Sequence, residues 1–104
     1  HSEKIYFMKL SIVMPVFNEE KTVAQVLKKV AEVKFKGITK EIIVVDDGST
    51  DKSVKKITST EIPGLKLYVH RKNQGKGAAV RTGIKYATGD YIIIHVGYLN
   101  VSSQ

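Results

Sequence analysis

Two adjacent carboxylates, Asp46 and Asp47, follow an apolar run at residues 42–45 and precede Gly48 and Ser49. Carboxylates fixed at the end of a strand can accept hydrogen bonds from a base N–H or from ribose hydroxyls, or can help to hold a cation. Asp and Ser are also favoured in turns and at helix N-caps, so a plain turn that starts a helix fits the same residues. The residues alone leave both interpretations open.

A second feature that could do chemistry is the segment 73–77, which reads Asn-Gln-Gly-Lys-Gly. Its glycines permit close approach of the backbone to a ligand, and Lys76 falls near the start of a predicted helix, an arrangement suited to an anion. The spacing is neither that of a Walker P-loop nor that of the G-x-G-x-x-G dinucleotide fingerprint. The alternative is a flexible turn with a solvated lysine. The three histidines show no metal-ligand spacing, and we interpret them as surface or core residues: His1, His70 and His95.

The elements predicted around these residues would bring them to one edge of a sheet. Short β-rich runs predict strands and helical apolar spacing predicts helices. We expect strands at 10–14, 41–45, 65–70 and 91–95, alternating with helices at 21–33, 52–59 and 75–87. This βαβαβαβ order predicts an α/β, Rossmann-like, mostly parallel sheet with right-handed crossovers and helices on both faces. Ligands bind such sheets beyond the carboxyl ends of the strands, which is where the two features fall.

Local signals indicate how the first helix begins and ends. Asn18 is the expected N-cap, and Gly37 is the expected stop. Residues 1–8 have no cap, no useful period and no signal-peptide pattern. We interpret them as a vector-derived extension, with a short extra strand as the alternative, and we assign residues 9–104 to a single domain.

Composition narrows the partners without choosing one. A chain of 104 residues fits one domain, and the absence of cysteine excludes disulfides, thiolate metal sites and cysteine nucleophiles. A net charge of +7 favours an anionic partner, which could be nucleic acid, a lipid surface or a phosphorylated small molecule. Because the lysines are spread along the chain and no recognition motif is present, we expect no nucleic acid partner.

Four segments together resemble the family-2 glycosyltransferases, most closely the branch of dolichyl-phosphate mannose synthase and polyprenyl-phosphate glycosyltransferases. They occur in the family's order and at its spacing, at residues 11–20, 41–51, 73–79 and 87–92. The resemblance implies the nucleotide-sugar-binding half of a GT-A fold. It also implies that Pro15, Phe17 and Glu19 line a nucleotide site, that Val45 and Asp47 contact the base or ribose, and that Asp46 supports them. The region of Lys76 would form the third wall.

The sequence departs from the family pattern after the last predicted strand. There the family places an Asp-x-Asp motif whose carboxylates bind a divalent ion that neutralises the diphosphate leaving group. The aligned residues here are Val96-Gly97-Tyr98, and neither valine nor tyrosine replaces a hard oxygen ligand for Mg²⁺ or Mn²⁺. We therefore expect no metal cofactor in this chain, although full-length relatives would use Mg²⁺ or Mn²⁺, and we predict no catalytic residue and no activity by this chain alone.

The resemblance sets the expected partners. We expect a nucleoside diphosphate sugar as donor, bound weakly and with little metal dependence, and an anionic membrane surface or a lipid phosphate acceptor. This implies a cytoplasmic location, at the membrane surface. The alternative function is a non-enzymatic module that keeps the fold and binds a nucleotide or oligomerises.

The last predicted strand indicates how the chain would assemble. Ile92, Ile93 and Ile94 resemble a strand buried on both faces, yet the strands that would flank it in the full family fold lie outside this sequence. An exposed apolar edge is a template for pairing with another chain. We therefore predict a homodimer or swapped assembly through this strand, with residues 96–101 extending it.

Overall fold

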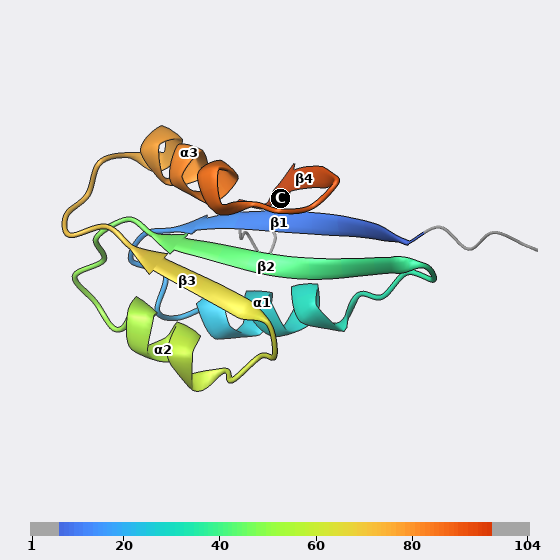
Figure 1. Cartoon of the computed structure of the whole chain (residues 1–104). Coiled ribbons are helices and arrows are strands. Elements are labelled where there is room, and N and C mark those ends of the chain that lie inside the picture. The colour runs from blue at the N-terminus through green and yellow to red at the C-terminus, as the bar shows by residue number, and fades with distance from the viewer. Residues whose placement is uncertain (1–6, 97–104) are drawn as a thin grey trace, which may run out of the picture.

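The computed structural model describes residues 7–96, and these form seven elements in the predicted alternation. They are β1 (Met8–Val16), α1 (Val23–Glu32), β2 (Ile38–Asp46), α2 (Ser53–Ser59), β3 (Leu65–Val69), α3 (Lys76–Tyr86) and β4 (Tyr91–Ile94). The strands pair in parallel in the order β3-β2-β1-β4. Helices α1 and α2 cover one face of the sheet and α3 covers the other (Figure 1). The predicted α/β fold is confirmed.

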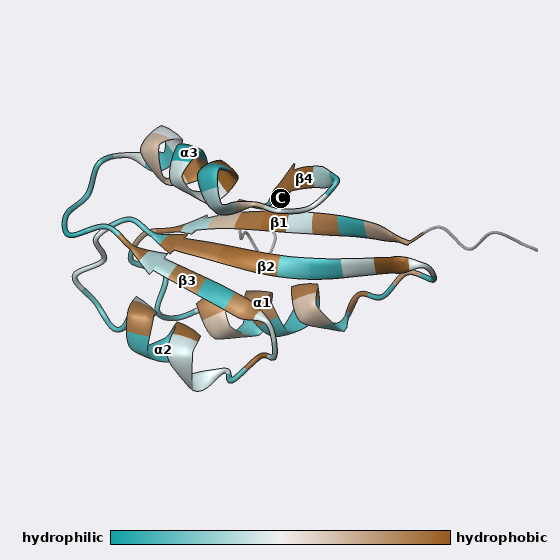
Figure 2. Cartoon of the chain, in the orientation of Figure 1, coloured by the Kyte–Doolittle hydropathy of each residue, from teal (hydrophilic) through white to brown (hydrophobic). Residues whose placement is uncertain are grey.

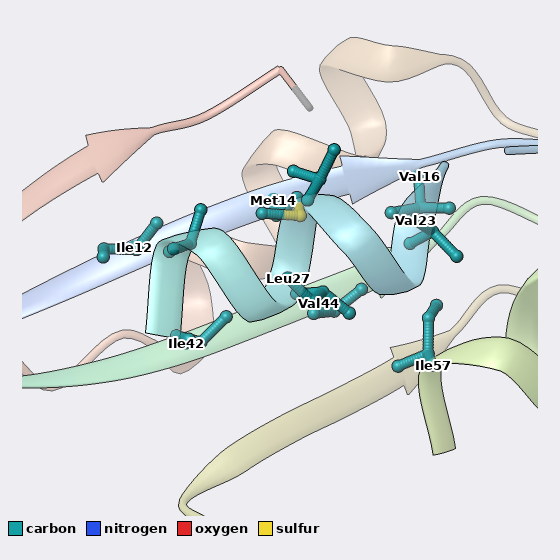
Figure 3. Packing of buried hydrophobic residues seen from close by; sticks show 10 residues of the cluster. Ile12, Met14, Val16, Val23, Leu27, Ile42, Val44 and Ile57 are labelled. Atoms are coloured by element: carbon teal, nitrogen blue, oxygen red, sulfur yellow. The ribbon is translucent and has the colours of Figure 1, made fainter. Parts of the chain in front are cut away.

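The core has two parts because alternate residues of β1 and β2 point to opposite faces of the sheet. On the face of α1 and α2 a larger cluster forms around Met14, Val44, Leu27 and Ile57 (Figure 3). On the face of α3 a smaller cluster contains Val13, Ile43, Val45 and Ala79. The carboxyl-terminal half of β2 is apolar and buried on both faces (Figure 2). This half of the sheet is the rigid platform on which the polar strand ends stand.

Helix α3 packs directly on β1 because a glycine faces the strand. A Cβ atom at Gly83 would lie 2.2 Å from Cγ1 of Val13, far inside van der Waals contact. Thr82, the residue before Gly83, is half-buried, and its hydroxyl oxygen lies 2.8 Å from Nε2 of His70.

The central strands are longer than predicted, and the first helix has different ends. Residues 8–10 of β1 pair with residues 38–40 of β2, so both strands extend beyond their apolar runs. The N-cap prediction for Asn18 is wrong: α1 begins at Val23, and Asn18 has a left-handed backbone with φ of 50°. The helix ends at Glu32, and Gly37, with φ of 78°, lies in the turn that leads into β2.

Strand β4 is exposed rather than buried on both faces, which corrects the description of residues 92–94 as a doubly buried strand. Its four side chains are 40–60% exposed, because β4 pairs with β1 along one edge and α3 lies over β1 and β2. Most of the predicted extension at residues 96–101 lies outside the described residues. So do residues 1–6 of the predicted N-terminal extension, whereas Met8 is the first residue of β1. Within residues 7–96, no helix is long and apolar enough to cross a membrane.

Candidate functional site

A cavity of about 180 Å³ opens where β1 and β2 end and α3 begins. Its lining comes from four separate parts of the sequence, which the parallel strand order brings to one edge of the sheet. Five of the seven predicted site residues line it: Pro15, Phe17, Glu19, Asp47 and Lys76. The lining is completed by Val16, Asn73, Ala79 and Val96.

The other two predicted residues lie behind the cavity wall. Val45 is completely buried in the smaller core cluster beside Ala79, so its side chain has no surface with which to contact a ligand. Asp46 is also completely buried, and its carboxylate accepts hydrogen bonds from the backbone N–H of Ser49 at 2.8 Å and from its hydroxyl at 2.6 Å. Asp46 thus shapes the turn that carries Asp47.

Asp47 organises the segment between β3 and α3. Its Oδ1 accepts from the backbone N–H of Gln74 at 2.9 Å and lies 2.8 Å from Nδ1 of His70. Its Oδ2 accepts from the backbone N–H of Gly75 at 2.8 Å and from the side-chain amide of Asn73 at 3.1 Å. A carboxylate offers about four lone-pair positions, so all of them are used within the chain.

The same contacts keep Asp47 ionised. Burial by itself raises the pKa of this carboxyl group, but the hydrogen bonds from Gln74, His70 and Gly75 outweigh it and lower the pKa below its ordinary value. Asp47 is therefore an anion whose hydrogen bonds order residues 73–75. Those residues lead directly into Lys76, the first residue of α3.

A glycine allows the two strand ends to approach each other. Gly48, next to Asp47, has φ of +76°, and a Cβ atom there would lie 2.4 Å from the carbonyl carbon of Lys72 and 2.5 Å from the nitrogen of Asn73. Only a residue without a side chain fits beneath the Lys72–Asn73 peptide. The turn after β2 and the segment after β3 therefore form one packed unit.

The loop after β1 is tied to the turn after β2 through Asn18. Its Oδ1 accepts from the backbone N–H groups of Thr50 at 2.8 Å and Asp51 at 3.3 Å, and its own N–H donates to the hydroxyl of Ser49 at 2.8 Å. The left-handed backbone of Asn18 thus serves to join two loops rather than to start a helix. Asparagine tolerates this conformation better than most residues.

Glu19 is held in place by the next part of that turn. The hydroxyl of Ser53 accepts from the backbone N–H of Glu19 at 2.8 Å and donates to Asp51 at 2.6 Å. Desolvation raises the pKa of Asp51, but the bonds from the Ser53 hydroxyl and N–H outweigh it and lower this pKa. The backbone of Glu19 is fixed in this way while its side chain lines the cavity.

Glu19 and Lys76 give the cavity its polar groups that are open to a ligand. Burial raises the pKa of Glu19, while its hydrogen bond with the Phe17 backbone and the charge of Lys76 act in the opposite direction. Lys76 is exposed and stands at the N-terminus of α3, where backbone N–H groups and the helix dipole favour negative charge. The cavity is suited to a ligand that combines an anionic group with hydroxyl or N–H donors.

The described residues do not fit a divalent cation. No group of three or more His, Asp or Glu side chains within residues 7–96 is placed to hold one. Val96 lines the cavity with methyl groups, and the carboxylates of Asp46 and Asp47 are engaged by N–H and O–H donors. The aligned residues 97 and 98 lie outside the described part of the chain.

The family is decided by comparison with known proteins. A model of the family described as "Glycosyl transferase family 2" matches residues 11–95. This chain belongs to glycosyltransferase family 2. The match covers all four segments on which the resemblance was based.

Two of the curated relatives that this chain is similar to are named for polyprenyl phosphates. The chain is 36% identical over 93 residues to the dolichyl-phosphate beta-glucosyltransferase of Trichomonas vaginalis, covering 82% of this chain and 29% of the relative. It is 34% identical over 95 residues to the dodecaprenyl-phosphate galacturonate synthase of Rhizobium johnstonii, covering 88% of this chain and 28% of the relative. The chain therefore spans less than a third of the length of either relative.

Solved glycosyltransferases share the fold and establish it as part of a GT-A fold. Staphylococcus aureus TarS residues 1–349 in complex with UDP superposes with a TM-score of 0.78 at 28% identity, covering 86% of this chain and 27% of TarS. Glucosyl-3-phosphoglycerate synthase of Mycobacterium tuberculosis, solved with Mn²⁺ and UDP, gives a TM-score of 0.72 at 25% identity, covering 86% and 33%. In length too, the chain corresponds to a part of such enzymes.

Sequence reasoning missed three residues that build the site. Asn73 belonged to the predicted anion-binding segment but not to the predicted site, Asn18 was interpreted as a cap, and His70 as a surface or core residue. The signal for Asn18 was its position beside the predicted cavity residues Phe17 and Glu19. For His70, the only signal was its place at the carboxyl end of a predicted strand.

Proposed function

We propose that the cavity at the carboxyl edge of the sheet binds the nucleoside diphosphate part of a nucleotide-sugar donor. The observation that supports this is the convergence of Lys76, Glu19 and the Asp47-ordered segment on one cavity, inside the region that matches the family. TarS, to which this chain is similar, has been solved with UDP and with UDP-GlcNAc. The ligand class thus agrees with the charge and shape of the site.

Each lining residue has a physical task in this proposal. Lys76 and the N-terminus of α3 neutralise the diphosphate, and the apolar surfaces of Pro15 and Phe17 pack against the base or ribose. Glu19 accepts from a hydroxyl. A ligand N–H can reach Asp47 only by replacing a present donor, and the Asn73 amide is the one whose displacement leaves the backbone in place. Val45 and Asp46 contribute from behind, by supporting the wall and the turn.

In a full-length relative, this region would be the donor side of a polyprenyl-phosphate glycosyltransferase. Transfer breaks the bond between the anomeric carbon and the diphosphate oxygen, and an acceptor oxygen forms the new bond while the nucleoside diphosphate leaves. A divalent ion would supply Lewis-acid stabilisation of that leaving group. Because the described residues do not fit such an ion, we propose nucleotide binding without turnover for this chain by itself.

Calorimetry with UDP and GDP, each with and without Mn²⁺, tests the proposal. We expect weak binding that Mn²⁺ changes by less than about twofold. Tight binding that depends on Mn²⁺ would overturn the metal-free site, and no binding of either nucleotide would overturn the proposal.

The charge contribution of Lys76 can be measured separately. Lys76→Ala should weaken nucleotide binding by about tenfold, since one charge-assisted contact to phosphate contributes roughly 1.5 kcal/mol. Lys28→Ala, which removes an exposed lysine from α1, is the charge-matched control and should leave the affinity unchanged. Equal losses in both variants would indicate a nonspecific charge effect.

We also propose that β4 pairs with β4 of a second copy. Tyr91–Ile94 is exposed and apolar, and within residues 7–96 it pairs along one edge only. Two identical edges can pair antiparallel about a two-fold axis. Light scattering at increasing concentration should then show a dimer, and Ile93→Lys should shift it to a monomer. A wild-type monomer at high concentration would reject this assembly.

Association with an anionic membrane surface is the third part of the proposal. Exposed cations surround the carboxyl edge of the sheet, at Lys21, Lys52, Arg71 and Lys72. Each basic group near an anionic surface contributes up to about 1 kcal/mol. Sedimentation with phosphatidylglycerol vesicles should therefore exceed sedimentation with phosphatidylcholine vesicles, and the excess should disappear at about 1 M salt. Equal sedimentation with both would exclude it.

A further inference from the structure

His70 connects the cavity to helix α3 through both of its ring nitrogens. Nδ1 lies 2.8 Å from Oδ1 of Asp47, and Nε2 lies 2.8 Å from Oγ1 of Thr82. The side chain is only 10% exposed. Its backbone is fixed as well, because the His70 N–H donates to the carbonyl of Asp46 at 2.8 Å.

These two contacts show which ring nitrogen of His70 carries a proton. Asp47 is an anion and can only accept, so Nδ1 of His70 must carry the proton that it donates. Nε2 either accepts from the hydroxyl of Thr82 or, when the ring is protonated, donates to it. In both states His70 presents a donor to Asp47, and Thr82 supplies the partner that the buried second nitrogen requires.

His70 differs in its position from the other three donors to the Asp47 carboxylate. Gln74, Gly75 and Asn73 belong to the segment that Asp47 orders, whereas His70 precedes that segment and is anchored to the sheet. Thr82 is anchored too, since its neighbour Gly83 packs against Val13. His70 is therefore the fixed donor that orients the carboxylate, and the carboxylate in turn orients the backbone leading to Lys76.

We propose that His70 is a positioning residue of the nucleotide site, which holds the Asp47 carboxylate in the orientation that places residues 73–76 at the cavity. The expected effect of His70 on nucleotide affinity rests on the proposed function, but the ordering of residues 73–76 can be tested without any ligand. His70 itself does not line the cavity and acts through Asp47.

Two substitutions separate this role from simple space filling. The side-chain amide nitrogen of asparagine can occupy the place of Nδ1, so His70→Asn keeps a donor for Asp47. In glutamine the amide nitrogen falls near the place of Nε2, so His70→Gln keeps the contact toward Thr82 and loses the donor to Asp47. Asparagine is the smaller of the two, so a role in filling space predicts the opposite ranking of the variants.

The first measurement is amide hydrogen exchange in the ligand-free wild-type chain and both variants, under conditions in which all are folded. In the wild type and in His70→Asn, the N–H groups of Gln74 and Gly75 should be protected. In His70→Gln their exchange should be faster by about tenfold or more, since a hydrogen bond to a charged group contributes at least that factor. Equal exchange in the two variants, or faster exchange in His70→Asn, would overturn the proposal.

The second measurement is calorimetry with UDP, or with GDP if GDP binds better. His70→Asn should bind within about twofold of the wild type, and His70→Gln about tenfold more weakly. A wild type that binds neither nucleotide would reject the proposed function, and the exchange data would still decide the role of His70. Wild-type binding that both variants retain equally would reject the role of His70 and leave the proposed function standing.

Discussion

Asp47 and Glu41 are two buried carboxylates on the α3 face of the molecule, and they differ in role: one borders the candidate site and the other stabilises the fold. Glu41 lies in β2 and Asp47 directly follows it, and each accepts hydrogen bonds from a segment that leads into a later element: α3 for Asp47 and β4 for Glu41. Asp47 holds the segment before α3 and borders a cavity. Glu41 holds the turn before β4 and is closed in by its partners: Ser11, Thr88, Lys9 and Lys66.

The partners explain the difference. Glu41 accepts from the Ser11 hydroxyl at 2.5 Å and the Thr88 N–H at 2.7 Å, and Lys66 and Lys9 lie 3.0 and 3.5 Å from its other oxygen. Its negative charge is thus balanced by two lysines inside the chain. Asp47 is surrounded by N–H donors and a histidine, while Lys76, which follows the segment that Asp47 orders, lines the cavity. Glu41 pairs with two lysines and so stabilises the fold. Asp47 is held by N–H donors instead, and the nearby Lys76 lines the cavity, where it can attract an anion.

The largest effect should come from filling the space under the Asp47 segment. Gly48→Ala places a methyl group 2.4 Å from the Lys72 carbonyl carbon and at a left-handed φ, so both steric overlap and backbone strain oppose folding. We expect a loss of about 3 kcal/mol or more in the free energy of unfolding, measured by urea titration.

Gly64→Ala is the matched control for that change. Gly64 has the same left-handed φ, +77°, but nothing lies within 4 Å of its added Cβ. It should cost only about 1 kcal/mol, the part due to strain. Equal losses at the two glycines would mean that close packing of the two loops contributes nothing.

The next effect concerns Glu41 and should change stability without changing affinity. Burial raises the pKa of Glu41, but hydrogen bonds from Ser11, Thr88 and Lys66 outweigh it and lower the pKa from 4.5 to about 2. A tenfold change in proton affinity corresponds to about 1.4 kcal/mol, so the ionised side chain contributes about 3 kcal/mol at neutral pH. Glu41→Gln should lose most of this and leave nucleotide affinity unchanged.

The pH dependence of that difference follows from the direction of the change in pKa. Because the folded-state pKa is lowered, the contribution is complete above about pH 4.5 and disappears as the pH falls toward 2. Urea titrations at pH 7, 4 and 3 should therefore show a shrinking gap between wild type and Glu41→Gln. Glu32→Gln on the exposed face of α1 is the control and should stay within about 0.5 kcal/mol at each pH. A gap that is constant with pH would contradict this account.

The comparison also shows what the sequence could predict. The alternation of apolar runs with helical spacing was sufficient for the strand and helix order, since the period of apolar residues directly reflects burial. The pair Asp46–Asp47 was placed at the right edge of the sheet for the same reason. The cluster around Glu41 was not predicted, because its partners come from residues 9, 11, 66 and 88, and no local pattern indicates that they meet. The contacts of His70 were not predicted and Asn18 was misinterpreted as an N-cap for the same reason: their roles depend on partners in other loops.

Strand β4 shows the converse limit of a local pattern. Three successive isoleucines are typical of a doubly buried strand, yet burial also requires neighbours, and within the described residues β4 has only β1. The composition of a strand therefore reports the environment it is suited to. In this chain it points to a surface that another strand would cover.

Asp47→Asn should destabilise the fold less than Gly48→Ala or Glu41→Gln does, but unlike Glu41→Gln it should weaken nucleotide binding. The amide oxygen of the new asparagine can still accept from two donors. Its amide nitrogen would take the place of Oδ2, where it could not accept from the Gly75 N–H or the Asn73 amide. We expect a loss of about 2 kcal/mol in the free energy of unfolding, because two partly buried donors lose their acceptor. Residues 73–75 should then exchange faster, and UDP or GDP binding should fall by about tenfold. If Asp47→Asn and Glu41→Gln reduced nucleotide affinity equally, the carboxylate that borders the cavity would not differ in function from the one that is enclosed by its partners.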